Sequence, residues 1–282
     1  MHYCVLPLHG SIKLFGNVPL FLHDDIQVRT IRSDDLGAII QKSRKMSEQL
    51  SPSGKCVIAV LESGEPGKDE IHRIALCSTF CLNLLARAGS TGCSSAFVIR
   101  KRRVSRVIKS VELPGQGSSN WASYSIASAS TNPSEVKVTY ESIANALAAD
   151  AGLRLSFGRF NSALGRENNT DKIIDMTICL ESIFSSGPEI KFRFALYNAL
   201  LASQGLEERK ASFKLMKDLY NMRSKVVHGS HELDRNWFVD NWPAILRIAK
   251  LALLAKIEFL QTFSRSEWQD HLDELALDGG VQ

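Results

Sequence analysis

The strongest structural signal in the chain is the stretch Glu207-Glu-Arg-Lys-Ala-Ser-Phe-Lys-Leu-Met-Lys-Asp-Leu-Tyr-Asn-Met-Arg-Ser-Lys-Val-Val-His228-Gly229. Most of its residues are good helix formers, and it contains no proline. Its apolar side chains recur at about the helical repeat, at Phe213, Met216, Leu219, Tyr220 and Val227. Gly229 then supplies a stop signal. The stretch therefore predicts one long helix over 207–228.

Upstream of this helix, the sequence also has a helical pattern, as far back as Asn132-Pro133. Asn132 is a good N-cap, and proline is well tolerated in the first turn of a helix. Beyond this point the strand signals vanish. Helices are predicted at 133–150, 153–164, 170–185, 189–203, 207–228 and 236–263, with a weaker one at 266–276. We therefore expect residues 133–282 to form an all-α bundle.

The first 132 residues have a different pattern. Short apolar runs bounded by Gly, Pro and Asp predict strands at Cys4–Leu8, Val18–Leu22, Ile26–Ile31, Cys56–Leu61 and Ala96–Arg100. Segments 36–47 and 69–87 are helical in character, whereas 104–111 fits a helix as well as a strand. Residues 1–132 are therefore predicted to form an α+β domain. We expect this domain to sense a ligand or to bind a partner protein.

Composition bounds the class of protein. With 282 residues, of which 44% are hydrophobic and 23% charged, the chain has room for two globular domains. No signal peptide is evident, and the most apolar run, Leu251–Ala255, is interrupted by Lys256 and Glu258. The six cysteines contain no Cys-x-x-Cys pair. We therefore expect a cytoplasmic protein without a membrane segment, with reduced thiols and with neither a metal nor another cofactor.

The positive charge is concentrated in the first half of the chain. Residues 151–282 carry 17 Lys and Arg against 17 Asp and Glu, so the net charge of +4 arises from residues 1–150. The densest basic cluster holds Arg100, Lys101, Arg102, Arg103 and Arg106. Such a cluster can track an RNA backbone. It can equally be a solvated strand edge whose charges prevent aggregation.

The end of the long helix holds the clearest chemical signal, Tyr220-Asn-Met-Arg223-Ser-Lys-Val-Val-His228. In the last turn, unpaired carbonyls and the helix dipole favour a protonated imidazole, and a histidine that titrates near neutrality serves as acid or base. Five residues correspond to about 140° of rotation, so Arg223 and His228 do not share one face of an ideal helix. They converge if the arginine swings round, if the last turn loosens, or if two copies meet across a dimer axis.

These residues carry a family resemblance. Arg223, four residues and then His228 resemble the Arg-x(4–6)-His signature of HEPN domains, and the surrounding sequence looks like the Apea-like branch. Upstream, Ile173-Ile-Asp175-Met-Thr-Ile-Cys-Leu180-Glu181 is similar to the Asp-x(4)-Leu-Glu helix of that branch, and 190–195 looks like its next helix. The resemblance covers about residues 150–265.

The resemblance implies a metal-independent ribonuclease that acts in a toxin, antiphage or RNA-processing system. HEPN domains are helical bundles that commonly form homodimers. Arg223 would bind the scissile phosphate of RNA and His228 would transfer protons, giving 2′,3′-cyclic phosphate ends. Ser224, Glu181, Lys225 and Tyr220 would support them. An antitoxin or sensor protein is a further expected partner.

Two alternatives remain open at the level of sequence. Active HEPN nucleases usually carry Asn, Asp or His directly after the arginine, whereas this chain has Ser224. The module can therefore be catalytically silent and serve to bind nucleic acid or nucleotide, or to dimerise. In the other alternative, Arg223 forms a salt bridge with Glu181 inside the bundle and His228 only caps the helix. A buried glutamate needs a partner, and Arg223 and Arg193 are the candidates.

Overall fold

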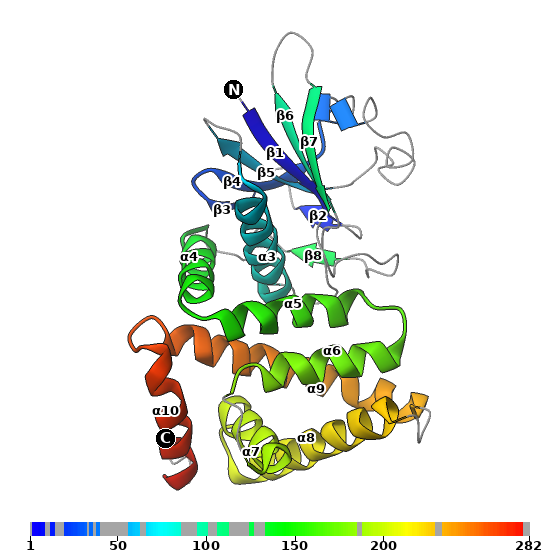
Figure 1. The fold of residues 1–282 in the computed structure, drawn as a ribbon, viewed down its shortest axis with the longest axis vertical. Coiled ribbons are helices and arrows are strands. Elements are labelled where there is room, and N and C mark those ends of the chain that lie inside the picture. Colours follow the sequence, from blue (N-terminus) through cyan, green and yellow to red (C-terminus); the bar gives the residue numbers. More distant parts are fainter. Residues whose placement is uncertain are drawn as a thin grey trace. The chain divides into compact units, whose positions relative to one another are not determined.

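The computed structural model describes residues 2–8, 12–14, 20–32, 34–35, 38–39, 56–62, 66–85, 95–100, 106–112, 124–126, 133–184, 188–228 and 233–278. The chain forms two compact units, 1–144 and 145–282 (Figure 1). The division falls inside helix α4 (Pro133–Ala149), whereas the sequence placed the boundary in front of this helix. Both units have the expected class: an α+β region is followed by an all-helical bundle.

The first unit is built on an antiparallel sheet of six strands in the order β3-β4-β5-β1-β6-β7 (Figure 1). The strands are β1 (His2–Pro7), β3 (Leu20–His23), β4 (Ile26–Thr30), β5 (Cys56–Glu62), β6 (Ser95–Arg100) and β7 (Arg106–Glu112). A small parallel pair joins β2 (Ile12–Leu14) to β8 (Tyr124–Ile126). Helix α3 runs from Lys68 to Leu85. The ambiguous segment 104–111 is thus mostly strand, because β7 pairs with β6 in a hairpin.

Helix α4 has an apolar face that accounts for the position of the division. Val136, Tyr140 and Ile143 are buried, and Lys137 Nζ lies 2.7 Å from the Asp24 carboxylate of the first unit. Burial raises the pKa of the Tyr140 hydroxyl, and the nearby Cys77 thiol of α3 raises it further. The first turns of α4 therefore complete the core of the α+β unit.

The second unit contains helices only, within the described residues. They are α5 (Ala151–Gly165), α6 (Asn169–Glu181), α7 (Ile190–Ala202), α8 (Leu206–Val227), α9 (Arg235–Phe259), the 3₁₀ turn η3 (Arg265–Glu267) and α10 (Trp268–Leu277). Asp150, Asn168 and Asp234 cap α5, α6 and α9 by accepting backbone N–H groups. Among the described helices, none combines the length and the apolar character needed to cross a membrane.

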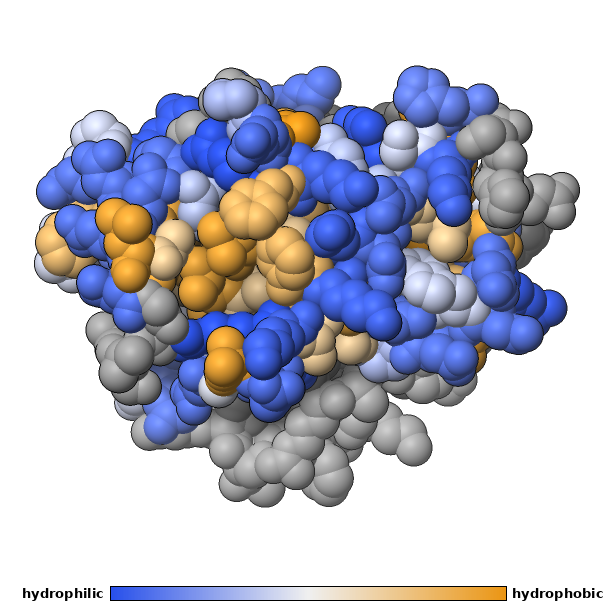
Figure 2. All heavy atoms as spheres, turned by 90° about the horizontal axis from the view of Figure 1, so that it is seen from below, coloured by the Kyte–Doolittle hydropathy of each residue, from blue (hydrophilic) through white to orange (hydrophobic). Residues whose placement is uncertain are grey.

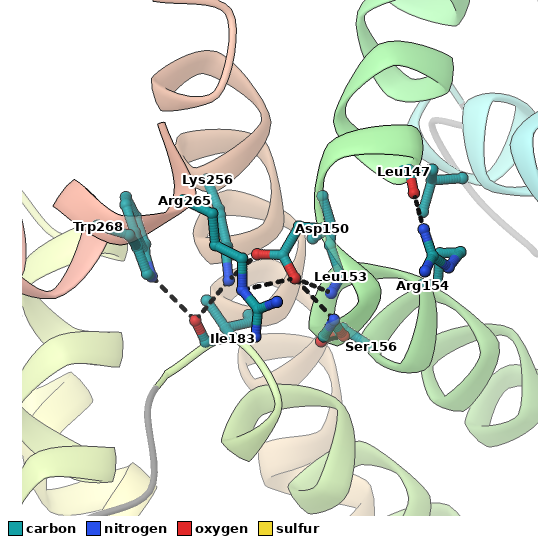
Figure 3. A network of polar contacts seen from close by, with 10 residues as sticks. Leu147, Asp150, Leu153, Arg154, Ser156, Ile183, Lys256, Arg265 and Trp268 are labelled. Atoms are coloured by element: carbon teal, nitrogen blue, oxygen red, sulfur yellow. Dashed lines mark hydrogen bonds and ion pairs between the residues drawn. The ribbon is translucent and has the colours of Figure 1, made fainter. Parts of the chain in front are cut away.

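A buried ionic network ties the helix ends of this bundle together (Figure 3). The fully buried Asp150 carboxylate accepts two N–H groups at the start of α5 and lies 2.8 Å from Lys256 Nζ of α9. Arg265 Nε is 3.6 Å away. The carbonyl of Ile183, just after α6, accepts Lys256 Nζ at 2.8 Å and Trp268 Nε1 at 2.9 Å. One carboxylate and one carbonyl thus connect α5, α6, α9 and α10.

The start of α5 also approaches the end of α6 closely at Gly152. A Cβ atom on Gly152 would lie 2.9 Å from the carbonyl oxygen of Ser182, which is backbone and cannot move aside cheaply. We expect Gly152→Ala to lower the free energy of unfolding by about 1–3 kcal/mol. A Cβ atom on Gly158 of the same helix would have nothing within 4 Å, so Gly158→Ala should stabilise the protein by roughly 0.5–1 kcal/mol. Urea unfolding measures both, and equal effects would contradict the close approach.

Candidate functional site

The candidate site lies on the C-terminal half of α8, which is held against α6 and α7 by a few apolar side chains. Met216 and Leu219 are fully buried. The ring of Tyr220 lies 5.4 Å, centroid to centroid, from the ring of Phe194 in α7. Val227 is 50% exposed, so the apolar face predicted for this helix ends before its last turn. The residues from Arg223 onward therefore lie at the edge of the bundle.

Arg223 has no counter-ion in the described part of the chain. The residue is half-buried, and its Nε atom is buried without a hydrogen-bond partner. The described residues contain no ion pair between Glu181 and either Arg223 or Arg193. Arg193 instead lies over the ring of Tyr197, 5.5 Å from its centroid. The salt bridge between Arg223 and Glu181, one of the alternatives left open by the sequence, is thus not among the ion pairs of the described residues.

Glu181 has a tyrosine as its partner. It is the last residue of α6, it is half-buried, and the Tyr220 hydroxyl of α8 donates a hydrogen bond to its carboxylate. Burial raises the pKa of Tyr220; the charge of Glu181 and this hydrogen bond raise it further, while the Arg223 guanidinium lowers it. Tyr220 therefore brings together two of the predicted site residues, Glu181 and Arg223.

His228 ends the helix with its backbone and exposes its side chain. Its N–H donates to the Ser224 carbonyl at 3.1 Å, and its φ and ψ of −86° and 4° leave the helical region. The imidazole is exposed, Lys225 is exposed, and Ser224 is half-buried. No hydrogen bond joins His228 to Arg223 in the described residues. The two candidate catalytic groups therefore both lie near the C-terminal end of α8.

Asp175, part of the upstream motif, has a structural role. It is 2% exposed, and its two oxygens accept Arg159 Nη1 at 2.7 Å and Arg166 Nε at 2.8 Å. Both arginines belong to α5 or to the turn that follows it. Asp175 therefore links α6 to α5 and takes no part in the group around Arg223.

Two residues of the predicted basic cluster, Arg100 and Arg106, lie in described strands. Arg100 is the last residue of β6 and pairs in the ladder with Arg106, the first residue of β7. Arg100 is half-buried. Lys101, Arg102 and Arg103 lie outside the described residues. The hairpin places Arg100 and Arg106 side by side, and RNA binding by this cluster stays a prediction.

The described cysteines are poor nucleophiles. Cys4, Cys77, Cys81 and Cys179 are buried free thiols. Burial raises the pKa of Cys77 and of Cys81 to about 12, so both thiols are neutral near pH 7. Within the ranges that the structure describes, no group of three or more His, Cys, Asp and Glu side chains is arranged to hold a metal ion. Among the described residues, the candidate catalytic groups are therefore those near the end of α8.

Known proteins do not extend this description. No family model matches the chain, and no curated protein or solved structure matches it either. A function for the site has to be argued from its own residues and from the motif around Arg223 and His228.

Proposed function

We propose that the chain is a metal-independent endoribonuclease of the HEPN type, in which Arg223 binds the scissile phosphate and His228 transfers protons. One observation carries the proposal: the Arg223 guanidinium is half-buried, forms no ion pair among the described residues, and has a buried Nε without a partner. Buried charges are normally paired. A guanidinium held without a counter-ion suits an external anion, and its planar donors match a phosphate.

Tyr220 and Glu181 serve this arginine as positioning residues. The Tyr220 hydroxyl donates to Glu181, so the carboxylate has a partner other than Arg223. The arrangement keeps the guanidinium in position and leaves its donors for a phosphodiester.

The reaction needs no metal. The imidazole of His228 accepts the proton of the ribose 2′-hydroxyl, and the 2′-oxygen forms a bond to the adjacent phosphorus. Arg223 neutralises the charge that grows on the non-bridging oxygens. The bond from phosphorus to the 5′-oxygen breaks, and an imidazolium returns a proton to that oxygen. The products are a 2′,3′-cyclic phosphate and a 5′-hydroxyl.

A homodimer can bring Arg223 and His228 together, although they point in different directions on one helix. Arg223 and His228 differ by about 140° in direction on an ideal helix, and no hydrogen bond joins them in the described residues. A twofold axis beside the end of α8 would bring the arginine of one subunit near the histidine of the other. We therefore propose that the active species is a dimer with composite sites.

A second candidate function is a silent HEPN module that binds RNA or nucleotide without cleaving it. The same separation of Arg223 from His228 favours it, as does Ser224, whose hydroxyl is shorter than the side chains usual at this position. In this case Arg223 still binds phosphate, whereas no proton transfer follows. Arg223 binds phosphate in both candidate functions, and only the nuclease releases cleavage products.

Arg223→Ala tests the proposal directly. Purified wild-type protein is incubated with single-stranded RNA in EDTA, and the ends of the products are analysed for cyclic phosphate. We expect the variant to cleave about 10²–10³ times more slowly, because one preorganised cation is lost from the transition state. Its melting temperature should stay close to that of the wild type, since Arg223 forms no ion pair in the described chain.

Arg247→Ala is the matched control. Arg247 lies on α9, is half-exposed, and pairs with Glu208 at 2.8 Å, so its removal should leave cleavage unchanged. Equal cleavage by Arg223→Ala and wild type would refute the assigned role. RNA binding without any cleavage by the wild type would select the second candidate.

A further inference from the structure

Four lysines form a stripe along one face of α8. Lys210, Lys214, Lys217 and Lys225 are all exposed, and their spacing places them on one side of the helix, with Asn221 filling the gap. His228 continues the same line three residues beyond Lys225. The helix carries six Lys and Arg against three Asp and Glu, although residues 151–282 as a whole have no net charge. The bundle therefore concentrates positive charge on α8.

Carboxylates on the same helix only partly offset this stripe. Glu207 pairs with Lys210 at 2.8 Å, but the two side chains are 86% and 61% exposed, so the pair is weak in water. Asp218 is half-buried beside the stripe. Lys217 Nζ lies 5.7 Å from the centroid of the Phe213 ring. The stripe thus keeps a net positive charge and has an aromatic side chain within it.

A surface pocket opens where this stripe meets the start of α7. Its volume is about 620 Å³, and it is lined by Glu189, Ile190, Lys191, Phe192 and Lys217. Phe192 is 50% exposed and meets the Phe213 ring edge-on, with centroids 5.7 Å apart. Figure 2 shows an apolar patch over α7 that is bordered by hydrophilic side chains. Lys217 belongs to both the stripe and the pocket.

We propose that this surface is the track for single-stranded RNA: the lysine face of α8, Lys210 to Lys225, follows the phosphates toward His228, and one base stacks on Phe192 in the pocket. This inference rests on the nuclease function proposed above. From Lys217 to His228 the helix rises about 16 Å. One RNA strand can therefore place a base in the pocket and a phosphate at His228.

The chemistry favours a single strand over other occupants. An exposed aromatic ring beside lysines binds an unstacked base, which a duplex does not present. Lysine is depleted in protein interfaces. The four lysines of the stripe and the two that line the pocket, Lys191 and Lys217, therefore fit a polyanion better than a protein partner. The pocket volume lies within the range that binds small ligands, which suits one nucleobase.

The pocket is tested by the affinity of a short single-stranded RNA, measured by fluorescence anisotropy. The measurement uses protein that also carries His228→Ala, so that cleavage does not interfere. We expect Phe192→Ala to weaken binding about five- to a hundredfold, because one stacked base is lost. Phe263→Ala is the control: Phe263 is 51% exposed but stacks on Phe259 at the end of α9. Its removal should leave the affinity unchanged.

The stripe is tested by salt dependence. Replacing both Lys214 and Lys217 by glutamine should reduce the slope of log K against log salt by about 1.4, because each phosphate contact to a single strand contributes roughly 0.7. Lys172→Gln is the matched control. Lys172 lies on α6, away from the stripe on α8, with its Nζ atom 5.8 Å from the centroid of the Phe238 ring. A purely structural role of the lysines would lower the affinity without changing this slope.

The outcomes separate the track from the nuclease function. Track variants that bind and cleave like the wild type would overturn the track and leave the nuclease intact. Strong binding that depends on Phe192 and the two lysines, in a wild type that does not cleave, would support the track and refute the nuclease. Loss of the dimer in Phe192→Ala, with RNA affinity unchanged, would make the patch a subunit interface and overturn the proposal.

Discussion

Replacing Lys256 by alanine is expected to lower the free energy of unfolding by about 3–5 kcal/mol, because it breaks a buried ion pair. The Lys256 and Asp150 side chains are 4% and 0% exposed. Removing the ammonium leaves a buried carboxylate without its main partner and takes one donor from the Ile183 carbonyl. Because these groups connect four helices, the loss should act on the whole bundle. Urea unfolding followed by tryptophan fluorescence measures it.

Two variants control this prediction. Arg265→Ala removes a side chain that is 62% exposed and 3.6 Å from Asp150, so we expect a loss below about 1 kcal/mol. The double variant Asp150→Asn with Lys256→Met removes both charges and should recover much of the loss, because no uncompensated ion remains. A Lys256→Ala protein as stable as the wild type would show that the pair contributes nothing.

The effect should also depend on pH. Burial alone would raise the pKa of Asp150, but Lys256, a backbone N–H and Arg265 outweigh it and hold the pKa below its ordinary value of 3.8. The native carboxyl then binds a proton less tightly than the unfolded one, so its contribution is present above this value and is lost as the pH falls through the lower native pKa. The difference between wild type and Lys256→Ala should therefore shrink in acid. A constant difference would contradict this assignment.

Replacing His228 by alanine is expected to reduce the rate of RNA cleavage by about 10²–10⁴, the range that general acid and base catalysis supplies. The imidazole is exposed, so the fold should be unaffected. The rate is measured with single-stranded RNA in EDTA, beside a growth assay in which expression of the wild type slows the cells and His228→Ala relieves the effect. His271→Ala is the control, since His271 stacks on Phe259 at 4.9 Å in another part of the bundle.

Mixing two inactive variants tests whether the sites are composite. If each site takes Arg223 from one subunit and His228 from the other, a mixed dimer of Arg223→Ala and His228→Ala contains one intact site. Random mixing should then restore about a quarter of the wild-type rate. If both residues act within one subunit, mixing restores nothing. Unchanged cleavage by His228→Ala alone would instead move the assignment away from this histidine.

The helices of the second unit follow from local sequence. Predicted segments at 133–150, 207–228 and 236–263 correspond to α4, α8 and α9, with shifts of at most four residues at their ends. Helix hydrogen bonds join residues four apart, so periodicity and caps within a short window decide where a helix begins and ends. The division between the units is different, because the apolar face of α4 suits either neighbour. Only packing assigns residues 133–144 to the sheet unit and the end of the helix to the bundle.

The sequence by itself determined that an α+β region precedes a helical bundle, and that Arg223 and His228 lie near the end of a long helix. Only the tertiary structure decided which polar groups meet. It paired Glu181 with Tyr220, left Arg223 without a counter-ion in the described chain, and buried Lys256 against Asp150. The physical reason is range: helix formation depends on neighbours within a few residues, whereas the partner of a buried charge depends on which helices pack together.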